Sequence, residues 1–420
     1  MSGQITSNVS RSSGIIAPTT GGLNWSTAVV TGSTATVEAQ NGYYINTTSQ
    51  ACTVTLPASP EVGDQIVLVD YARTWATNNL IIDSNGNNFQ GDPDTYTVDY
   101  STAGQSLSIV YSDATKGWLP VSDDAVAFDH GNPPTQKALY AFGTTGSKVS
   151  LKNLVNSSGV VAADVSGVGT ARSALAAAGY GGDKAIFGFG TTGSATGVTN
   201  LVSNSGVVAA DTSAVGTAKA NGLGAATYGG DKAIFAYGAN NAGNLVSTSN
   251  LVNNNGVVGS DVTGVGTARQ YLAATGYGVD KAIFAYGNTG SLTNIKNLVN
   301  NNGVIAANAS SAGTSRAYLS AARYGVGLAI FAFGQSSGAV NTRNLVNSSG
   351  VVAADASGAG TARYGGGMAV YGGDKAIFAF GNGRTNLSNL ISNTGVVGSD
   401  VTGVGTARDN LAAAGYSLSA

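Results

Sequence analysis

The chain has 420 residues, of which 61 are glycine and only 10% are charged, and its formal net charge is −2. This length allows two or three domains with a sizeable core. So much glycine and so little charge disfavour solvated helical faces and favour turns and alternating apolar strands, which indicates an all-β protein. No run of lysine or arginine occurs, so the phosphate attraction that nucleic-acid binding requires is missing.

Residues 1–24 are rich in serine, threonine, glycine and asparagine. Such a segment is either a flexible tail or an attachment tail that docks in extended form on another protein by strand addition. The chain begins without a basic segment followed by an apolar one, and no stretch approaches about 18 uninterrupted apolar residues. We therefore expect neither a secretory signal nor membrane insertion.

Residues 25–122 hold all three tryptophans and share no period with the rest of the chain. Apolar and polar residues alternate in several runs, at 42–46, 53–57, 65–69, 79–83 and 106–111, with glycine, asparagine, aspartate or proline between them. This pattern predicts a compact β-sandwich or jelly-roll-like module. Cys52, the single cysteine, is expected in one of its strands as a small apolar residue.

Residues 123–136 are expected to be a linker, and they contain His130, the single histidine. One imidazole cannot form a zinc site of the three-histidine kind, and one cysteine cannot form a CxxC site. A general base on His130 would have to act from the linker itself. We therefore expect no catalytic residue, no metal and no cofactor.

From residue 137 to residue 420 the chain repeats itself. The aromatic residue of a short motif that closes with glycine recurs at spacings of 47, 48, 49, 47 and 47 residues, at Tyr140, Phe187, Phe235, Phe284, Phe331 and Phe378. Each unit continues with Asn-Leu, a turn ending in glycine, a Val-Val or Val-Ile pair, a Thr-Ala-Arg-like motif and a run of small residues. This order predicts four short strands per unit.

Glycine interrupts every candidate helix of the repeat, which excludes helical repeats, and four short strands per unit match a blade of a β-propeller. The chain ends in an unpartnered strand at 411–416, and the first unit lacks this strand. The C-terminal strand is therefore expected to enter the first blade and close a six-bladed ring over 137–420, which removes an open sheet edge. An open solenoid is the alternative.

Two resemblances support this interpretation. The run at 172–190 resembles a kelch repeat, although it has one closing glycine and no late tryptophan. The strings at 42–47, 54–57 and 116–118, together with the Gly-Asp-Lys-Ala-Ile-Phe-Gly repeats, resemble tail-fibre and related appendage proteins of tailed phages, especially those of cyanobacteria and other marine hosts. The resemblance implies a virion protein assembled in the host cytoplasm, a homotrimer whose N-terminal region contacts other virion proteins, and host recognition by the distal domain.

The carboxylates do not indicate an enzyme. Glycoside hydrolysis normally uses one pair of carboxylates, whereas the aspartates of the repeat recur at equivalent positions after the Val-Val strand, at Asp164, Asp211, Asp261, Asp355 and Asp400. Recurring aspartates favour turn and capping roles. The basic residue after Thr-Ala could bind an anionic glycan around the axis, but the matching numbers of basic and acidic positions favour pairs within or between blades.

Specificity is expected where the units differ. The segments between the closing glycine and Asn-Leu vary in sequence, and they are 144–152, 191–199, 239–249, 288–296, 335–343 and 382–388. Variation in loops on a fixed scaffold is typical of binding surfaces, although neutral drift produces it too. The candidate receptor-contact residues in these inserts are Lys148, Lys152, Asn240, Asn241, Asn244, Lys296, Arg343 and Arg384.

Together these features predict a phage appendage protein that displays a propeller toward a host-surface glycan or protein. A capsid or neck decoration that binds no receptor is the first alternative. A propeller lectin is the second.

Overall fold

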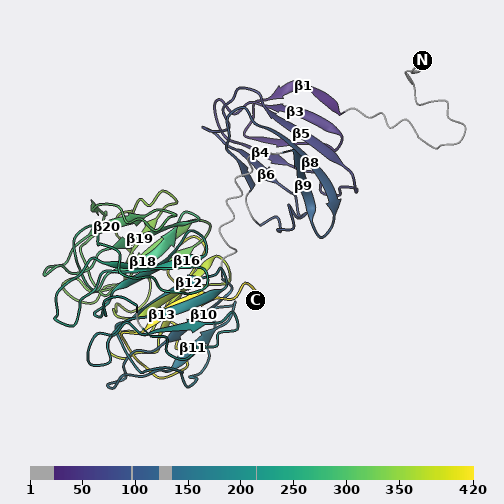
Figure 1. The fold of residues 1–420 in the computed structure, drawn as a ribbon. Coiled ribbons are helices and arrows are strands. Elements are labelled where there is room, and N and C mark those ends of the chain that lie inside the picture. The colour runs from purple at the N-terminus through teal and green to yellow at the C-terminus, as the bar shows by residue number, and fades with distance from the viewer. Residues whose placement is uncertain (1–22, 96–97, 123–134, 214) are drawn as a thin grey trace, which may run out of the picture. The chain divides into compact units, whose positions relative to one another are not determined.

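The computed structural model describes residues 23–95, 98–122, 135–213 and 215–420, and these residues form strands and loops without a helix (Figure 1). The expectation of an all-β protein is therefore confirmed. The chain divides into two compact units, residues 1–130 and 131–420. Most of the expected tail, His130 and residues 123–134 of the expected linker lie outside the described residues.

The described part of the first unit contains two sheets. The strands of the five-stranded sheet are β1 (Asn24–Val30), β3 (Asn41–Ile45), β5 (Gln65–Asp70), β8 (Ser106–Asp113) and β9 (Gly117–Ser122). Those of the four-stranded sheet are β2 (Thr34–Thr36), β4 (Cys52–Thr55), β6 (Leu80–Asp83) and β7 (Val98–Tyr100).

The chain alternates between these two sheets from β1 to β6. As a result β1, β3 and β5 are parallel neighbours in one sheet, and β2, β4 and β6 are parallel neighbours in the other. Only β7, β8 and β9 add antiparallel pairs. The expected two-layer module is present, but its parallel winding differs from the antiparallel Greek keys of a jelly roll.

One core lies between the two sheets of the first unit. It includes Trp75 and Trp118, both fully buried, together with apolar residues that alternate along the strands. Cys52 of β4 belongs to this core and is fully buried, and burial raises the pKa of its thiol. The expectation that Cys52 is a small apolar strand residue is confirmed.

The described part of the second unit contains six small sheets, and each has a first, a second and a third strand (Figure 1). The first strands are β12 (Ala176–Tyr180), β15 (Gly224–Tyr228), β18 (Ala273–Tyr277), β22 (Ser320–Tyr324), β26 (Gly367–Tyr371) and β29 (Ala412–Tyr416). The second strands are β10 (Lys137–Ala141), β13 (Lys184–Gly188), β16 (Lys232–Ala236), β19 (Lys281–Ala285), β23 (Leu328–Ala332) and β27 (Lys375–Ala379). The third strands are β11 (Lys152–Val155), β14 (Thr199–Val202), β17 (Ser249–Val252), β20 (Ile295–Val299), β24 (Thr342–Val346) and β28 (Ser388–Ile391).

The strand expected at the Val-Val or Val-Ile pair is reduced to a single bridge in each of the six sheets, such as Val155 with Val161. Further along, the chain contacts the third strand a second time. Among the described residues this second contact forms the two-residue strands β21 (Ala309–Ser310) and β25 (Ala356–Ser357) in two sheets, and a single bridge such as Lys152 with Val165 in the other four. The aspartate or asparagine between the two contacts accepts a hydrogen bond from the asparagine of the third strand, as Asp164 does from Asn153.

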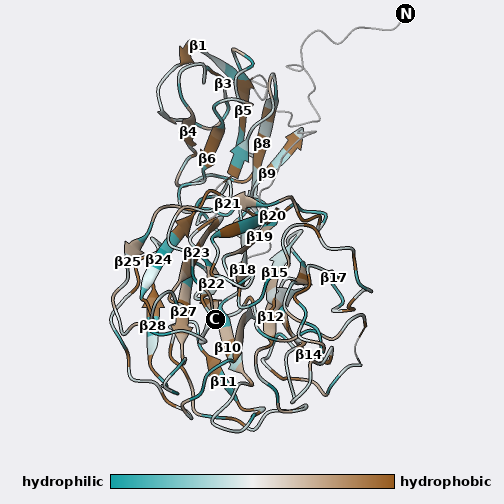
Figure 2. Ribbon diagram, turned by 90° about the vertical axis from the view of Figure 1, so that its left-hand side faces the viewer, coloured by the Kyte–Doolittle hydropathy of each residue, from teal (hydrophilic) through white to brown (hydrophobic). Residues whose placement is uncertain are grey.

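The C-terminal strand completes the sheet of the first repeat unit, as expected. β29 pairs antiparallel with β10, and Lys137 lies opposite Tyr416. The first strands contact one another in the order β12, β15, β18, β22, β26 and β29, and β29 contacts β12 again. Figure 2 shows the sheets of this unit arranged around a common centre.

Backbone hydrogen bonds link the six sheets at both ends of their first strands. In each of these bonds the amide of the first-named residue donates to the carbonyl of the second. At one end the bonds are Ala174 to Asn410, Asn410 to Gly365, Gly365 to Tyr318, Tyr318 to Tyr271, Tyr271 to Asn221 and Gly222 to Ala174. At the other end they are Gly181 to Asp231, Gly229 to Asp280, Gly278 to Gly327, Gly325 to Asp374, Gly372 to Gln136 and Ser417 to Asp183. Gln136, expected in the linker, therefore takes the place of a turn residue of the repeat.

The core of the second unit lies between neighbouring sheets. The second strand of each sheet is almost completely buried, and its aromatic side chain meets an aromatic residue of the next sheet. The ring centroids of Phe142 and Phe187 are 5.8 Å apart, and those of Tyr140 and Phe380 are 5.3 Å apart. Apolar burial between sheets is therefore what holds each sheet to its neighbours.

Candidate binding face at the insert end

The six inserts begin next to the start of the first strands. Ser173, just before β12, bridges Thr191, the first residue of an insert, and Gln270 before β18 bridges Asn288 in the same way. Inserts and first-strand starts therefore share one end of the sheets, which we call the insert end. The opposite end carries turns such as Gly181–Asp183, and we call it the turn end.

Three of the expected contact residues bind the neighbouring sheet. Lys152 Nζ donates a hydrogen bond to the Gly206 carbonyl at 2.9 Å, and Lys296 Nζ donates to the Gly350 carbonyl at 3.0 Å. Arg343 makes the same contact with the Gly395 carbonyl. Partial burial lowers the pKa of both lysines. These three cations lie at the start of β11, β20 and β24 and tie each of these three sheets to the next.

The asparagines of the longest insert shape loops. Asn240 Oδ1 accepts hydrogen bonds from the amides of Ala242 and Asn244, which closes the loop on itself. Asn241 Oδ1 accepts from the Ala195 amide of the preceding insert at 2.6 Å. Asn241 and Asn244 are exposed, so they lie on the solvent side of this face.

The remaining two expected residues are Lys148, which is partly exposed, and Arg384, which is exposed. Arg384 lies near Asp409, which precedes β29. Burial raises the pKa of the Asp409 carboxyl, and the Arg384 charge opposes this rise. These residues form a polar border where the last insert meets the first sheet.

A tyrosine cluster lies at the same end, and the sequence analysis missed it. Tyr271 and Tyr318 stack with ring centroids 3.9 Å apart and an interplanar angle of 22°. Tyr364 continues the row, with its centroid 5.5 Å from that of Tyr318. All three are partly exposed. The signal was present in the sequence, because these tyrosines follow the Thr-Ala-Arg-like motif in three consecutive units and the other three units have none there.

Two of these tyrosines adopt an unfavourable backbone conformation. Tyr271 has φ 55° and Tyr318 has φ 54°, in the left-handed region that bulky residues rarely occupy. Ala174, Asn221 and Asn410 have the same conformation at the equivalent positions, with φ of 52°, 60° and 52°. The fold therefore accepts a small or amide side chain at this position and does not require tyrosine.

The basic residues of the Thr-Ala-Arg-like motif are not available to a ligand. Arg172, Lys219, Arg269, Arg316, Arg363 and Arg408 are all buried. Arg172 Nε donates to the Phe189 carbonyl at 3.0 Å, and its guanidinium lies 4.1 Å from the centre of the Phe142 ring. Burial lowers the pKa of Arg172 to about 10, although Asp211 opposes this shift. An axial ring of cations for an anionic glycan is therefore excluded.

These buried cations pair with aspartates, as the matching counts predicted, and the structure shows that each aspartate belongs to the next repeat unit. The N···O distances are 4.0 Å for Arg172 with Asp211, 3.9 Å for Lys219 with Asp261, 3.8 Å for Arg316 with Asp355, 3.5 Å for Arg363 with Asp400 and 3.7 Å for Arg408 with Asp164. Unit four has Asn308 in place of the aspartate.

Each of the five aspartates is held by neutral donors as well. Asp211 accepts from the Thr170 amide and hydroxyl and from the Asn200 side chain. Burial by itself raises the pKa of the Asp211 carboxyl, but the hydrogen bonds outweigh it and the pKa lies below its usual value. The other four carboxyls behave in the same way, and a structural role for the repeated aspartates follows.

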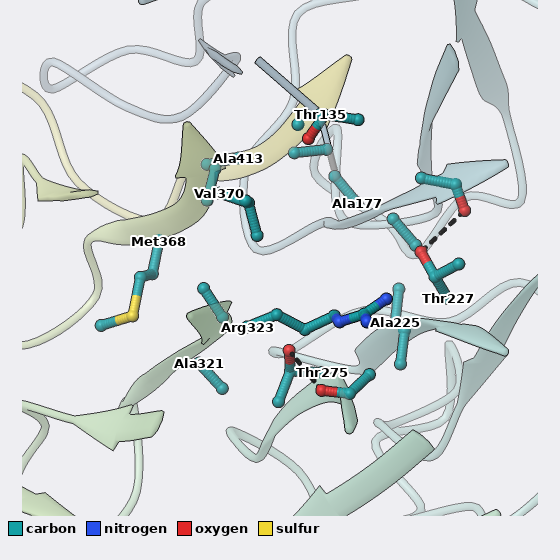
Figure 3. A pocket seen from close by; sticks show the side chains of 18 of the residues that line it. Thr135, Ala177, Ala225, Thr227, Thr275, Ala321, Arg323, Met368, Val370 and Ala413 are labelled. Carbon is teal, nitrogen blue, oxygen red and sulfur yellow. Dashed lines mark hydrogen bonds between the residues drawn. The ribbon is translucent and has the colours of Figure 1, made fainter. Parts of the chain in front are cut away.

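A small cavity of about 120 Å³ runs between the first strands. Equivalent positions of these strands line it with Ala177, Ala225, Ala274, Ala321, Met368 and Ala413. Figure 3 shows the Arg323 side chain reaching across it, and Arg323 Nη2 donates to the Gly278 carbonyl at 3.3 Å. Alanine side chains leave room for little more than solvent, so the cavity contributes no large binding surface.

No protein family and no curated protein matches this chain. Among the described residues, no helix has the length and apolar character needed to cross a membrane. The same residues contain no group of three or more histidine, cysteine, aspartate or glutamate side chains placed to hold a metal ion.

Proposed function

We propose that the protein is a virion appendage protein of a tailed phage, in which residues 135–420 form a six-bladed β-propeller that presents its insert end to the host surface. The propeller is supported by the cyclic contacts of the first strands and by the pairing of β29 with β10. The phage assignment is supported by the resemblance of the short strings and repeats in the sequence.

One observation carries the proposal of display. Thr135 and Gln136 bring the chain into the second unit at the turn end, where their carbonyls accept from Gly373 and Gly372. The variable inserts and the tyrosine cluster lie at the opposite end. A unit anchored through its N-terminal side would therefore leave the insert end free to meet a target.

The function that this arrangement supports is binding and not catalysis. The repeated aspartates are engaged by threonine, asparagine and a buried cation, so they are unsuited to act as general acids or bases. Several loops on one face can instead act together and raise the avidity above that of any single loop.

The test is adsorption of the fluorescently labelled full chain to cyanobacterial cells. In the test variant the exposed insert tips, 146–147, 192–194, 241–244, 290–291, 337–339 and 383–384, are replaced by Gly/Ser of equal length. In the control variant the same number of exposed residues is replaced at turn-end positions. We expect adsorption to be lost only in the first variant.

Unchanged adsorption would favour a structural decoration that binds no receptor. Immunogold labelling of purified cyanophage particles with an antibody to this chain tests the virion assignment separately. Absence of label from every part of the particle would contradict it.

A further inference from the structure

We propose that the tyrosine cluster Tyr271, Tyr318 and Tyr364 is a binding subsite for a neutral, hexose-containing glycan. This inference rests on the proposed function, because it names the ligand class of the insert end. Four steps lead to it.

The first step is that the fold does not require tyrosine at these positions. Ala174, Asn221 and Asn410 occupy the positions equivalent to Tyr271 and Tyr318, with the same left-handed backbone and the same chain of hydrogen bonds between sheets, and Gly365 occupies that position beside Tyr364. A left-handed conformation is unfavourable for a non-glycine residue, and asparagine tolerates it better than tyrosine. Tyrosine therefore carries backbone strain at Tyr271 and Tyr318.

The second step is that packing does not offset this cost. Other aromatic residues with positive φ occur in the second unit, such as Phe142 and Phe189, but these are fully buried between sheets. Tyr271 and Tyr318 are partly exposed at the insert end. Strain at an exposed aromatic residue indicates a role outside the fold.

The third step concerns the chemistry of the row. The backbone of Tyr271 and Tyr318 is fixed by hydrogen bonds to the neighbouring sheets on both sides, and the two rings stack on each other. Burial raises the pKa of Tyr318, and the hydrogen bond with Tyr271 adds to this rise. Aromatic rings with hydroxyl groups offer both apolar contact and hydrogen bonding, which is the combination that a sugar ring and its hydroxyls can use.

The fourth step concerns the neighbours of the cluster. In the backbone circuit Tyr271 and Tyr318 lie between Asn221 on one side and Gly365, the residue after Tyr364, on the other, and Asn410 follows Gly365. Asn221 and Asn410 are partly exposed. Amide side chains both donate and accept, as sugar hydroxyls do. The repeated basic residues are buried, and five of the six pair with aspartate, so they are not available to an anionic ligand.

The test is a titration of the full chain, labelled with ¹³C-tyrosine, with maltohexaose and with cellohexaose at millimolar concentrations. We expect at least one of them to shift the ring signals of Tyr271, Tyr318 and Tyr364. In the triple variant Tyr271→Asn, Tyr318→Asn, Tyr364→Asn, we expect binding to be at least about tenfold weaker. Asn221 and Asn410 already occupy the position of Tyr271 and Tyr318, and Ser173 and Gln270 occupy that of Tyr364, so the variant should melt at the same temperature as the wild type or higher.

The control is Tyr71→Asn, which removes an exposed tyrosine of the first unit and should leave binding unchanged. The inference is overturned if neither hexaose moves the cluster signals, or if the triple variant binds as well as the wild type. If cell adsorption still depends on the insert tips in that case, the proposed function stands and only the tyrosine subsite is wrong. If adsorption is also independent of the tips, both fail.

Discussion

Thr406 and Asp164 are separated by 242 positions in the sequence, yet the Thr406 amide donates a hydrogen bond to Asp164 Oδ2 at 2.8 Å. The Thr406 hydroxyl donates to the same oxygen. Consecutive units make the same pair, for example Thr170 with Asp211 and Thr314 with Asp355. The last unit therefore bonds to the first as each unit bonds to its successor.

The Thr406 to Asp164 pair should contribute to stability. We expect Thr406→Val and Asp164→Ala each to lower the free energy of unfolding by about 1–2 kcal/mol, because each leaves polar groups without partners. Asp164→Asn should lower the free energy of unfolding by less, because Asn308 of unit four already bonds to both the amide and the hydroxyl of Thr267 in unit three. Urea unfolding of the three variants measures these differences. Equal losses for Asp164→Asn and Asp164→Ala would contradict this account.

Removal of the C-terminal strand should open the second unit. Deletion of 411–420 exposes the edge of β10 and removes the buried residues Leu411, Ala412 and Tyr416. We expect a loss of at least about 4 kcal/mol and aggregation through the free edge. Deletion of 418–420 keeps β29 and serves as the control. Light scattering and thermal melting test this, and a monodisperse long truncation with an unchanged melting temperature would refute it.

Stability should fall in acid. The carboxyls of Asp164, Asp211, Asp261, Asp355 and Asp400 have lowered pKa values in the folded state. A lowered pKa contributes stability that is present above the unfolded pKa of about 3.9 and is lost as the pH falls through the folded pKa. The melting temperature should therefore drop below about pH 4.

The control for the acid prediction is a variant with all five aspartates changed to asparagine. Its free energy of unfolding should be lower at neutral pH. It should lose less stability between about pH 5 and pH 2, because the five carboxyls that take up protons there are absent. If wild type and variant lose stability in parallel, other carboxyls govern the acid transition.

Lys219 should make stability depend on pH in the alkaline range. Burial lowers its pKa to about 8, with Asp261 opposing the shift, and its Nζ donates to Asn250 Oδ1 at 2.5 Å. Between about pH 8 and 10 the unfolded state binds more protons at this site, so the free energy of unfolding rises with pH, by on the order of 1–2 kcal/mol. Lys219→Arg should remove most of this rise up to about pH 9, because Arg172 at the equivalent position has a pKa of about 10 and stays charged there.

The experiment compares urea unfolding of wild type and Lys219→Arg at about pH 7.5, 8 and 9, all below the pKa of the equivalent Arg172. Arginine occupies the equivalent position in the other five units, so the variant is expected to fold. A constant difference between the two proteins across this range would show that Lys219 does not titrate there.

Assembly should depend on the first unit. We expect the full chain to be a homotrimer through residues 1 to 125 and a fragment of residues 131–420 to be a monomer, because the second unit satisfies its own sheet edges in the pairing of β29 with β10. Light scattering of both proteins tests this. If the fragment is trimeric, the trimer interface lies in the second unit and this prediction is wrong.

The amino-acid sequence by itself determined the features that depend on the repeat period and on the number of repeated motifs. The all-β class, the six units, the pairing of 411–416 with the strand at Lys137 and the pairing of the repeated basic residues with aspartates, though not whether in the same or the next unit, follow from strings that recur at fixed spacing. Such strings specify the same local hydrogen bonds and the same buried positions in every unit. Their regular spacing along the sequence was therefore enough to predict these features.

Only the tertiary structure decided which side chains meet solvent and which meet a neighbour. Lys152, Lys296 and Arg343 lie in variable inserts, but adjacent sheets approach so closely that a glycine carbonyl of the next sheet captures each of them. The tyrosine cluster forms because the segments before three first strands, 46 to 47 residues apart in the sequence, converge at the insert end, where Tyr271, Tyr318 and Gly365 join one circuit of backbone bonds. The parallel winding of the first unit was unpredictable for the same reason, since alternation along a strand records its buried face and not its partner strand.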